Sequence, residues 1–98
     1  MLLYTTQASD DLAEMHTVVE PGLFRELVRR LILLETSAST FEAMFTPHVD
    51  TRSPGDGETV GPRTIHVLEA AGGLKFVIVY RLSLDDEDVW IERLGYGF

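Results

Sequence analysis

The sequence predicts an α+β domain in which an antiparallel sheet is covered on one face by two helices. Three observations support this fold class. Apolar residues recur at helical spacing early in the chain, strand-like segments fill its last third, and a stretch rich in Pro, Gly and Asp separates the two parts. The apolar share of 45% and the charged share of 24% are those of a globular protein, so we expect one domain over residues 1–98.

The N-terminal part predicts one strand followed by two helices. Residues 2–6 form an apolar, strand-like segment, after which Ser9 can cap a short amphipathic helix that runs to about residue 15. Pro21 occupies the preferred first position of a second helix. Its apolar residues recur every three or four positions through residue 34, with charged residues on the opposite side, which makes it the clearest helix of the chain.

The rest of the chain predicts a long loop and a three-stranded meander. Residues 41–45 favour a further turn of helix, and residues 46–62 have the composition of a surface loop. Three strand-like segments follow, at residues 64–69, 74–83 and 89–94, joined by an Ala-Gly turn and an acidic turn. Together with the N-terminal strand they make up the expected antiparallel sheet.

Alternation of side chains assigns residues to the two faces of this sheet, if Glu69 pairs with Leu74 and Ser83 with Val89. One face is then apolar, and the helix that begins at Pro21 should cover it: Ile65, Val67, Phe76, Ile78, Tyr80, Leu82, Trp90 and Leu94. The other face stays open and carries a histidine and three cations but no acid: Thr64, His66, Leu68, Lys75, Val77, Val79, Arg81, Ile91 and Arg93. These cations either mark a working surface or only solubilise an exposed sheet.

The charge balance excludes some classes of function. The chain carries 16 acidic and 8 basic residues, a net charge of −8, which argues against a general affinity for nucleic acid. It has no cysteine and no apolar run that approaches the ~20 residues needed to span a bilayer, so we expect no membrane partner and a cytoplasmic location.

Metal, cofactor and hydrolase sites have little support in the sequence. His16, His48 and His66 lack the mutual spacing of metal ligands, and the TPHVD segment around His48 fits an ordinary loop better than a metal site. Ser37 and Ser39 have no base at a defined spacing, and no glycine-rich phosphate loop is present. We expect neither a metal ion nor a cofactor.

Two segments show patterns found together in one superfamily. YTTQASDDLAEM pairs an aromatic-Thr strand end with a helix that has Ala and Asp-Leu at set offsets: Tyr4, Thr5, Ala8, Asp11, Leu12 and Met15. GLKFVIVYRLSLDDEDVWIERLGY has a Gly-x-basic start, a Val-Tyr-Arg run, an acidic turn and an apolar last strand: Gly73, Lys75, Val79, Tyr80, Arg81, Leu82, Asp85, Asp86, Trp90, Ile91 and Gly95. In this order the two segments, roughly half of the chain, resemble the RelE/ParE superfamily of toxins.

The resemblance implies a component of a toxin–antitoxin system that a cognate antitoxin holds inactive. RelE-like members cut mRNA on the ribosome and ParE-like members act on DNA gyrase. A RelE-like member would be a metal-independent endoribonuclease that uses cations of the open face to stabilise the reacting phosphate. On this reading His66 would act as general acid or base, with Lys75 and Arg81 as the catalytic cations.

The resemblance also implies a surface for the antitoxin, or for self-association, on the same open face. The predicted partner-binding residues are Val77, Val79, Arg81, Ile91 and Arg93. The sequence departs from the family where Tyr96-Gly97-Phe98 follows Gly95, since relatives usually continue with a His-Arg or Lys-Arg pair, and such toxins are usually basic. The alternative prediction is therefore a non-catalytic α+β interaction domain, which can be homodimeric.

Overall fold

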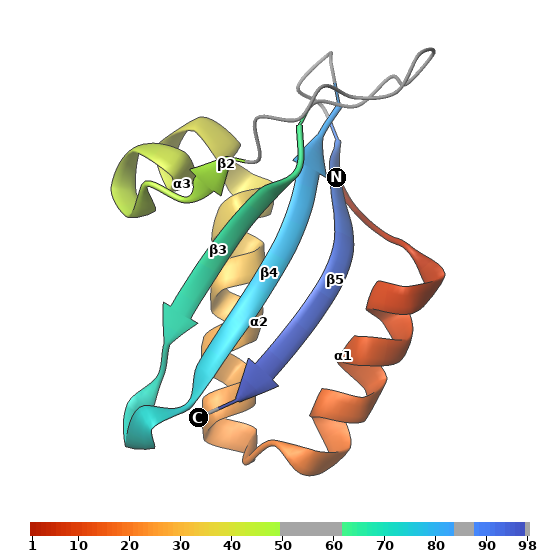
Figure 1. The fold of residues 1–98 in the computed structure, drawn as a ribbon, viewed down its shortest axis with the longest axis vertical. Coiled ribbons are helices and arrows are strands. Elements are labelled where there is room, and N and C mark those ends of the chain that lie inside the picture. The colour runs from red at the N-terminus through yellow and green to blue at the C-terminus, as the bar shows by residue number, and fades with distance from the viewer. Residues whose placement is uncertain (50–61, 84–87, 98) are drawn as a thin grey trace.

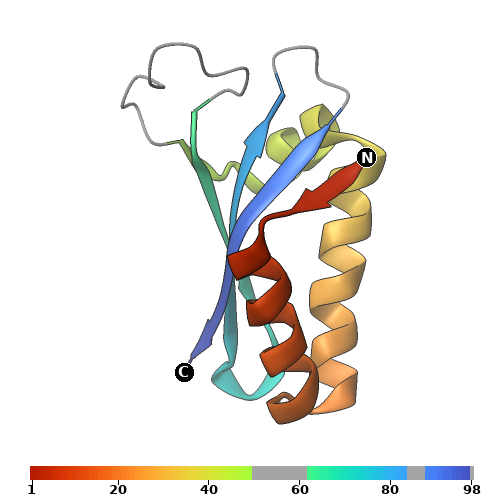
Figure 2. The same ribbon diagram turned by 90° about the vertical axis from the view of Figure 1, so that its right-hand side faces the viewer.

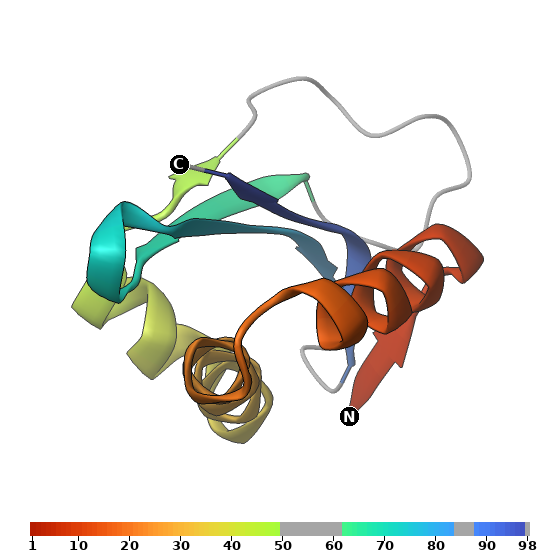
Figure 3. The ribbon, with the colours of Figure 1, turned by 90° about the horizontal axis from the view of Figure 1, so that it is seen from below.

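The structure, a computed structural model, describes residues 1–49, 62–83 and 88–97, and in these residues three α-helices cover one face of a five-stranded sheet (Figure 1). In chain order the elements are β1 (Leu2–Tyr4), α1 (Thr6–Val18), α2 (Pro21–Thr36), α3 (Ala38–Phe45), β2 (His48–Val49), β3 (Thr64–Glu69), β4 (Lys75–Leu82) and β5 (Val89–Gly97). Seen from below, the helices lie together on one side of the sheet (Figure 3). The α+β class predicted from the sequence is confirmed.

The sheet is mixed, which corrects the predicted antiparallel arrangement. Its strands follow the order β1-β5-β4-β3-β2, and β1 joins the C-terminal strands as expected, but it runs parallel to β5. A tight hairpin forces its two strands to be antiparallel, whereas β1 and β5 are separated by the helices and the meander. Their relative direction is therefore set by how the helices return the chain to the sheet, which alternation along single strands does not reveal.

The helices are longer than predicted. Helix α1 begins at Thr6, because the side chain of Thr5 caps it by accepting a hydrogen bond from the backbone N–H of Ala8 at 3.1 Å, so the predicted cap at Ser9 is wrong. This earlier start places Ala8 on the buried side of α1. Helix α2 has Pro21 in its first turn, as predicted, and α3, capped by Ser37, extends the predicted turn into a further helix.

The predicted 46–62 loop contains a short strand among its described residues. His48 pairs with Ile65 and Val49 pairs with Thr64, so β2 extends the edge of the sheet beside β3. Residues 50–61 of this predicted loop lie outside the described residues.

The register between β3 and β4 differs from the assumed one by a single residue. Glu69 pairs with Lys75 instead of Leu74, because a turn with positive φ angles at Gly72 and Gly73 takes up one more residue. A slip of one residue turns every side chain of the strand to the other face. The side chains of Thr64, His66 and Leu68 are consequently buried, and those of Ile65 and Val67 lie on the open side.

A bulge changes the faces of β5 as well. Val79 pairs with Arg93 as assumed, but the next pair joins Tyr80 to Ile91, so Glu92 is left without an opposite residue. Ile91 is fully buried and Trp90 is 36% exposed, so their predicted faces are wrong. Helix α2 therefore covers Phe76 and Ile78, as expected, but not Trp90.

The core lies between the sheet and the helices. Tyr80, Phe76 and Ile78 of β4 are fully buried beneath side chains of α2 and α3 such as Leu31 and Phe41.

None of the helices in the described residues is both long enough and apolar enough to cross a membrane.

Candidate functional site: the open face of the sheet

The face of β3, β4 and β5 that points away from the helices, here called the open face, carries an apolar stripe. Figure 2 shows the sheet edge-on, with the helices confined to the other side. The stripe consists of Ile65 and Val67 of β3 and Val77 and Val79 of β4. Val67 is 49% exposed, and the other three are partly buried. Beta-branched side chains hold a few rotamers only, so this stripe is stiff as well as apolar.

A carboxylate lies on the open face between two arginines. Glu92, left over by the bulge, accepts from Arg63 Nε at 3.0 Å through Oε2 and forms an ion pair with Arg81 through Oε1. The side chain of Arg81 is only 18% exposed, so it serves mainly to hold Glu92 in the face. The expectation that this face has no acid is thus wrong. A hollow of about 520 Å³ next to this group is lined by Thr5, Arg63, Ile65, Val79, Glu92 and Arg93.

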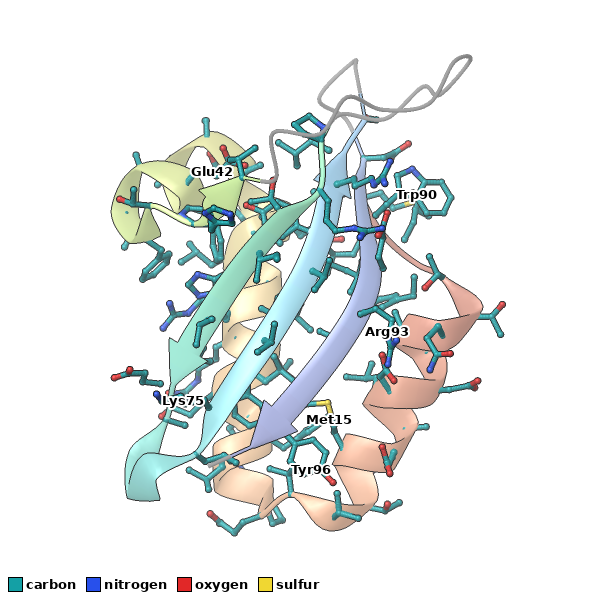
Figure 4. All side chains as sticks on the ribbon, in the orientation of Figure 1. Met15, Glu42, Lys75, Trp90, Arg93 and Tyr96 are labelled. Carbon is teal, nitrogen blue, oxygen red and sulfur yellow. The ribbon has the colours of Figure 1, made fainter. Side chains whose placement is uncertain are left out.

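Two other cations of the open face are more exposed. Lys75 lies 3.9 Å from Glu69, and its side chain is 54% exposed. Arg93 donates from Nε to Asp11 of α1 at 3.0 Å, and its side chain is 60% exposed. Figure 4 shows Lys75 near the start of β4 and Arg93 on the side of β5 next to α1. Since surface ion pairs contribute little, Lys75 can exchange Glu69 for a carboxylate offered by a partner. Arg93 is tied to the buried Asp11, so it would meet a partner carboxylate only through the exposed part of its side chain.

The summed charge of this surface has the opposite sign to that of the chain. In the described residues, four cations meet three carboxylates on or beside the open face, which leaves a net charge of +1: Arg63, Lys75, Arg81 and Arg93 against Asp11, Glu69 and Glu92. The whole chain carries −8, of which −5 belongs to residues 50–61 and 84–87, outside the described residues. The open face is therefore the less acidic side of an acidic protein.

His66 lies on the opposite face from the one predicted. Its ring is buried against Phe41 and Phe45, with ring centroids 4.7 and 5.3 Å away, and its Nε2 lies 3.2 Å from Arg30 Nη1. Burial, and then the charge of Arg30, lower the pKa of His66 to about 4. His66 is thus a neutral acceptor for Arg30, whose guanidinium also stacks on the Phe45 ring at 4.0 Å.

The structure does not bring the three predicted catalytic residues together. Lys75 and Arg81 both lie on the open face, as predicted, but they are six positions apart along β4, a distance of about 20 Å. His66 points to the helix side of the sheet. A general acid or base has to lie within hydrogen-bond reach of the reacting group, so this set cannot act on one phosphate in the described arrangement.

Of the predicted partner-binding residues, Val77, Val79 and Arg93 lie on the open face and are accessible in part. Arg81 is on this face but is held by Glu92, and Ile91 is buried in the core. Sequence reasoning missed Glu92, which the bulge brings to this face, and Arg63, which donates to it.

The N-terminal motif has a structural role in joining α1 to β5. The hydroxyl of Thr5 donates to the carbonyl oxygen of Glu92 at 2.8 Å, and Asp11 Oδ2 accepts from the backbone N–H of Leu94 at 3.0 Å. Burial alone would raise the pKa of Asp11, but the hydrogen bonds from Leu94, Arg93 and Gln7 lower it below its ordinary value. This carboxylate is therefore an anchor of the fold.

No metal site is found in the described part of the chain, where no three His, Asp or Glu residues lie close enough to share an ion. Asp50, which the TPHVD segment would contribute, is outside the described residues. The sequence matches no protein-family model, and no curated protein or solved structure is similar enough to count as a match.

Proposed function

We propose that this chain is a protein-binding domain that holds its partner on the open face of the sheet. The observation that carries the proposal is the apolar stripe of Ile65, Val67, Val77 and Val79 on a face that none of the described helices covers. Apolar patches with a polar rim mark interaction sites. A sheet covered by helices on one side only can accept a further layer on the other.

The partner fitted to this face combines apolar side chains with carboxylates. Its apolar residues would pack on the stripe, and its carboxylates would reach Lys75 and Arg93, the exposed cations at the two sides of that stripe. A carboxylate of the partner would meet less repulsion on this face, with its net charge of +1 in the described residues, than elsewhere on the acidic chain. In the terms of the RelE/ParE resemblance, the chain would be a cytoplasmic relative that keeps the antitoxin-binding scaffold without the cleavage activity.

A photo-crosslinking experiment tests this surface. A benzoylphenylalanine in place of Val67, which is 49% exposed on the open face, should form a discrete adduct with one protein in the source cells. Met44 of α3 is 60% exposed on the helix side and is the matched control position. Adding Lys75→Glu, which leaves the Asp11 anchor untouched, should reduce the Val67 adduct about 10-fold, because a carboxylate of the partner would then meet a like charge. Equal adducts at Val67 and Met44 would remove the proposal.

The second candidate is an active toxin that cleaves mRNA or acts on gyrase and is neutralised by an antitoxin. The exposed position of Lys75 on the open face favours it, because a phosphate could reach this cation. Inducing the chain alone should then arrest growth, and Lys75→Ala should relieve the arrest. Arg29→Ala, which changes an exposed arginine of α2, should not relieve it. Normal growth during induction would exclude this candidate and leave the binding domain.

A further inference from the structure

Helix α2 is apolar on two adjacent sides, which is more than one sheet can cover. One row of apolar residues is buried against the sheet: Leu27, Leu31 and Leu34. A second apolar row consists of the residues that directly follow the leucines at 23, 27 and 31: Phe24, Val28 and Ile32. Ile32 is 54% exposed. A surface helix ordinarily needs a single apolar stripe about 100° wide, so the second row predicts a further contact.

Phe24 and Val28 of the second row line a groove between α1 and α2, here called the helix groove, and Ile32 follows them one turn further along α2. The two helices run in roughly opposite directions, as Figures 1 and 2 show, and the rings of His16 and Phe24 meet in the groove with centroids 5.2 Å apart. Hollows of about 370 and 240 Å³ adjoin this pair of rings. Their remaining lining is mainly apolar: Tyr4, Ser9, Leu12 and Ala13 for the first, and Pro21, Arg25 and Val28 for the second.

The two banks of the helix groove carry opposite charges. Asp10 and Glu14 follow the groove-lining residues of α1 by one position, which places them on its outer bank. Arg25 and Arg29 occupy the corresponding bank of α2. All four side chains belong to exposed residues, and the structure gives none of them an ion pair within residues 1–49, 62–83 and 88–97.

The heights of these charges along the helices match in pairs. The rings of His16 and Phe24 are in contact, and α1 and α2 run antiparallel, so the two residues lie at similar heights, to within about one helical turn. Glu14, two residues before His16, therefore lies near the height of Arg25, and Asp10, one turn earlier, lies near the height of Arg29, each to within about one helical turn.

We propose that a second copy of this chain docks on the helix groove, related to the first by a two-fold axis parallel to the helices. This rotation leaves the position of each residue along the helix axes unchanged and exchanges left and right in the α1–α2 layer. Helix α1 of one copy therefore faces α2 of the other. Glu14 then meets Arg25 of the partner subunit, and Asp10 meets Arg29 of the partner subunit. The second rows of the two α2 helices pack together in the middle of the contact and form its apolar centre, and the charged pairs lie on either side of it.

The size of the contact predicts a weak dimer. Two helices of 13 and 16 residues present a face of about 20 Å by 20 Å, so the dimer would bury on the order of 1,000 Å² in total. Contacts of this size belong to the transient class, and we expect a Kd in the micromolar range. The open face remains free in this arrangement because it lies on the other side of the sheet.

Sedimentation velocity over protein concentrations of about 5 to 500 µM tests the proposal. The unmodified chain should form a dimer, and Arg25→Glu with Arg29→Glu should raise the Kd about 100-fold. The reversed pair, Asp10→Lys with Glu14→Lys, should do the same. An equimolar mixture of the two double variants should again form a dimer, because each acidic bank then faces a basic one. A loss of fold could not produce this recovery.

Val67→Asp on the open face is the matched control and should leave the dimer intact. A chain that stays monomeric at every concentration overturns the proposal. A dimer that persists in both charge-reversal variants also overturns it. If Val67→Asp dissociates the dimer, the chain self-associates through the open face and not through the helix groove.

Discussion

The buried histidine should make the stability of this protein depend on pH in a defined window. His66 has a pKa of about 4 in the folded chain, against 6.5 for an ordinary histidine. The unfolded chain therefore binds a proton at this residue below about pH 6.5, whereas the folded chain binds it only below about pH 4. The free energy of unfolding is highest above this window and falls as the pH falls through it. Below about pH 4 both states bind the proton, and the loss stops growing.

The magnitude follows from the size of the shift. Each unit of pKa difference corresponds to about 1.36 kcal/mol, so lowering the pH from about 7.5 to about 4.5 should cost about 2.5 kcal/mol through His66. With a urea m-value of about 1 to 2 kcal/mol per M, the midpoint of unfolding should fall by about 1.2 to 2.5 M. Urea titrations followed by circular dichroism at the two pH values measure this change.

A variant separates the effect of His66 from that of the carboxylates. His66→Gln keeps an acceptor for Arg30 but cannot take up a proton, so its midpoint should change much less between the two pH values. His16→Gln, which alters an exposed histidine, should keep the full dependence. If His66→Gln loses as much stability as the unmodified chain over this range, His66 is not the source of the pH dependence.

Three further changes test individual contacts, each through the free energy of unfolding in urea. Asp11→Asn should cost about 2 kcal/mol, because the carboxylate that accepts the backbone N–H of Leu94 is buried; a loss below 0.5 kcal/mol would mean that this anchor is dispensable. Tyr80→Phe removes the hydroxyl that donates to Glu42 at 3.1 Å and should cost about 1 kcal/mol, whereas an unchanged midpoint would show that the bond adds nothing. Thr46→Gly should raise stability by up to about 1 kcal/mol, because a β-branched residue is strained at φ 46°, and a loss of stability would show that the strain is compensated.

Helix α2 and the C-terminal meander could be predicted because their signals are local. Pro21 with its periodic leucines defines α2, and the three strand-like segments predict β3, β4 and β5 within a few residues. The direction of β1 could not be predicted, since it depends on how the helices pack on the sheet. The short β2 strand has no periodicity of its own and exists through its pairing with β3.

The candidate site was harder to predict because two small irregularities decide it. One extra residue in the turn around Gly72 moved His66 into the core, and one bulged residue brought Glu92 to the open face. The second had a signal in the sequence. Strict alternation puts Glu92 on the apolar face between Trp90 and Leu94, and an unpaired carboxylate is costly there, so a bulge was the better prediction. The extra residue in the turn between β3 and β4 was indicated in the sequence only by the Gly72-Gly73 pair.

Binding of the crosslinked partner to Val67→Asp tests the central claim most directly. Val67 is exposed in the apolar stripe, so this change should leave the fold intact while it places a charge at the centre of the proposed contact. We expect Val67→Asp to raise the Kd for the partner about 100-fold, and Ile32→Asp, a similarly exposed change on the helix side, to alter it less than about 3-fold. If Val67→Asp binds the partner as tightly as the unmodified chain does, the open face is not the binding surface.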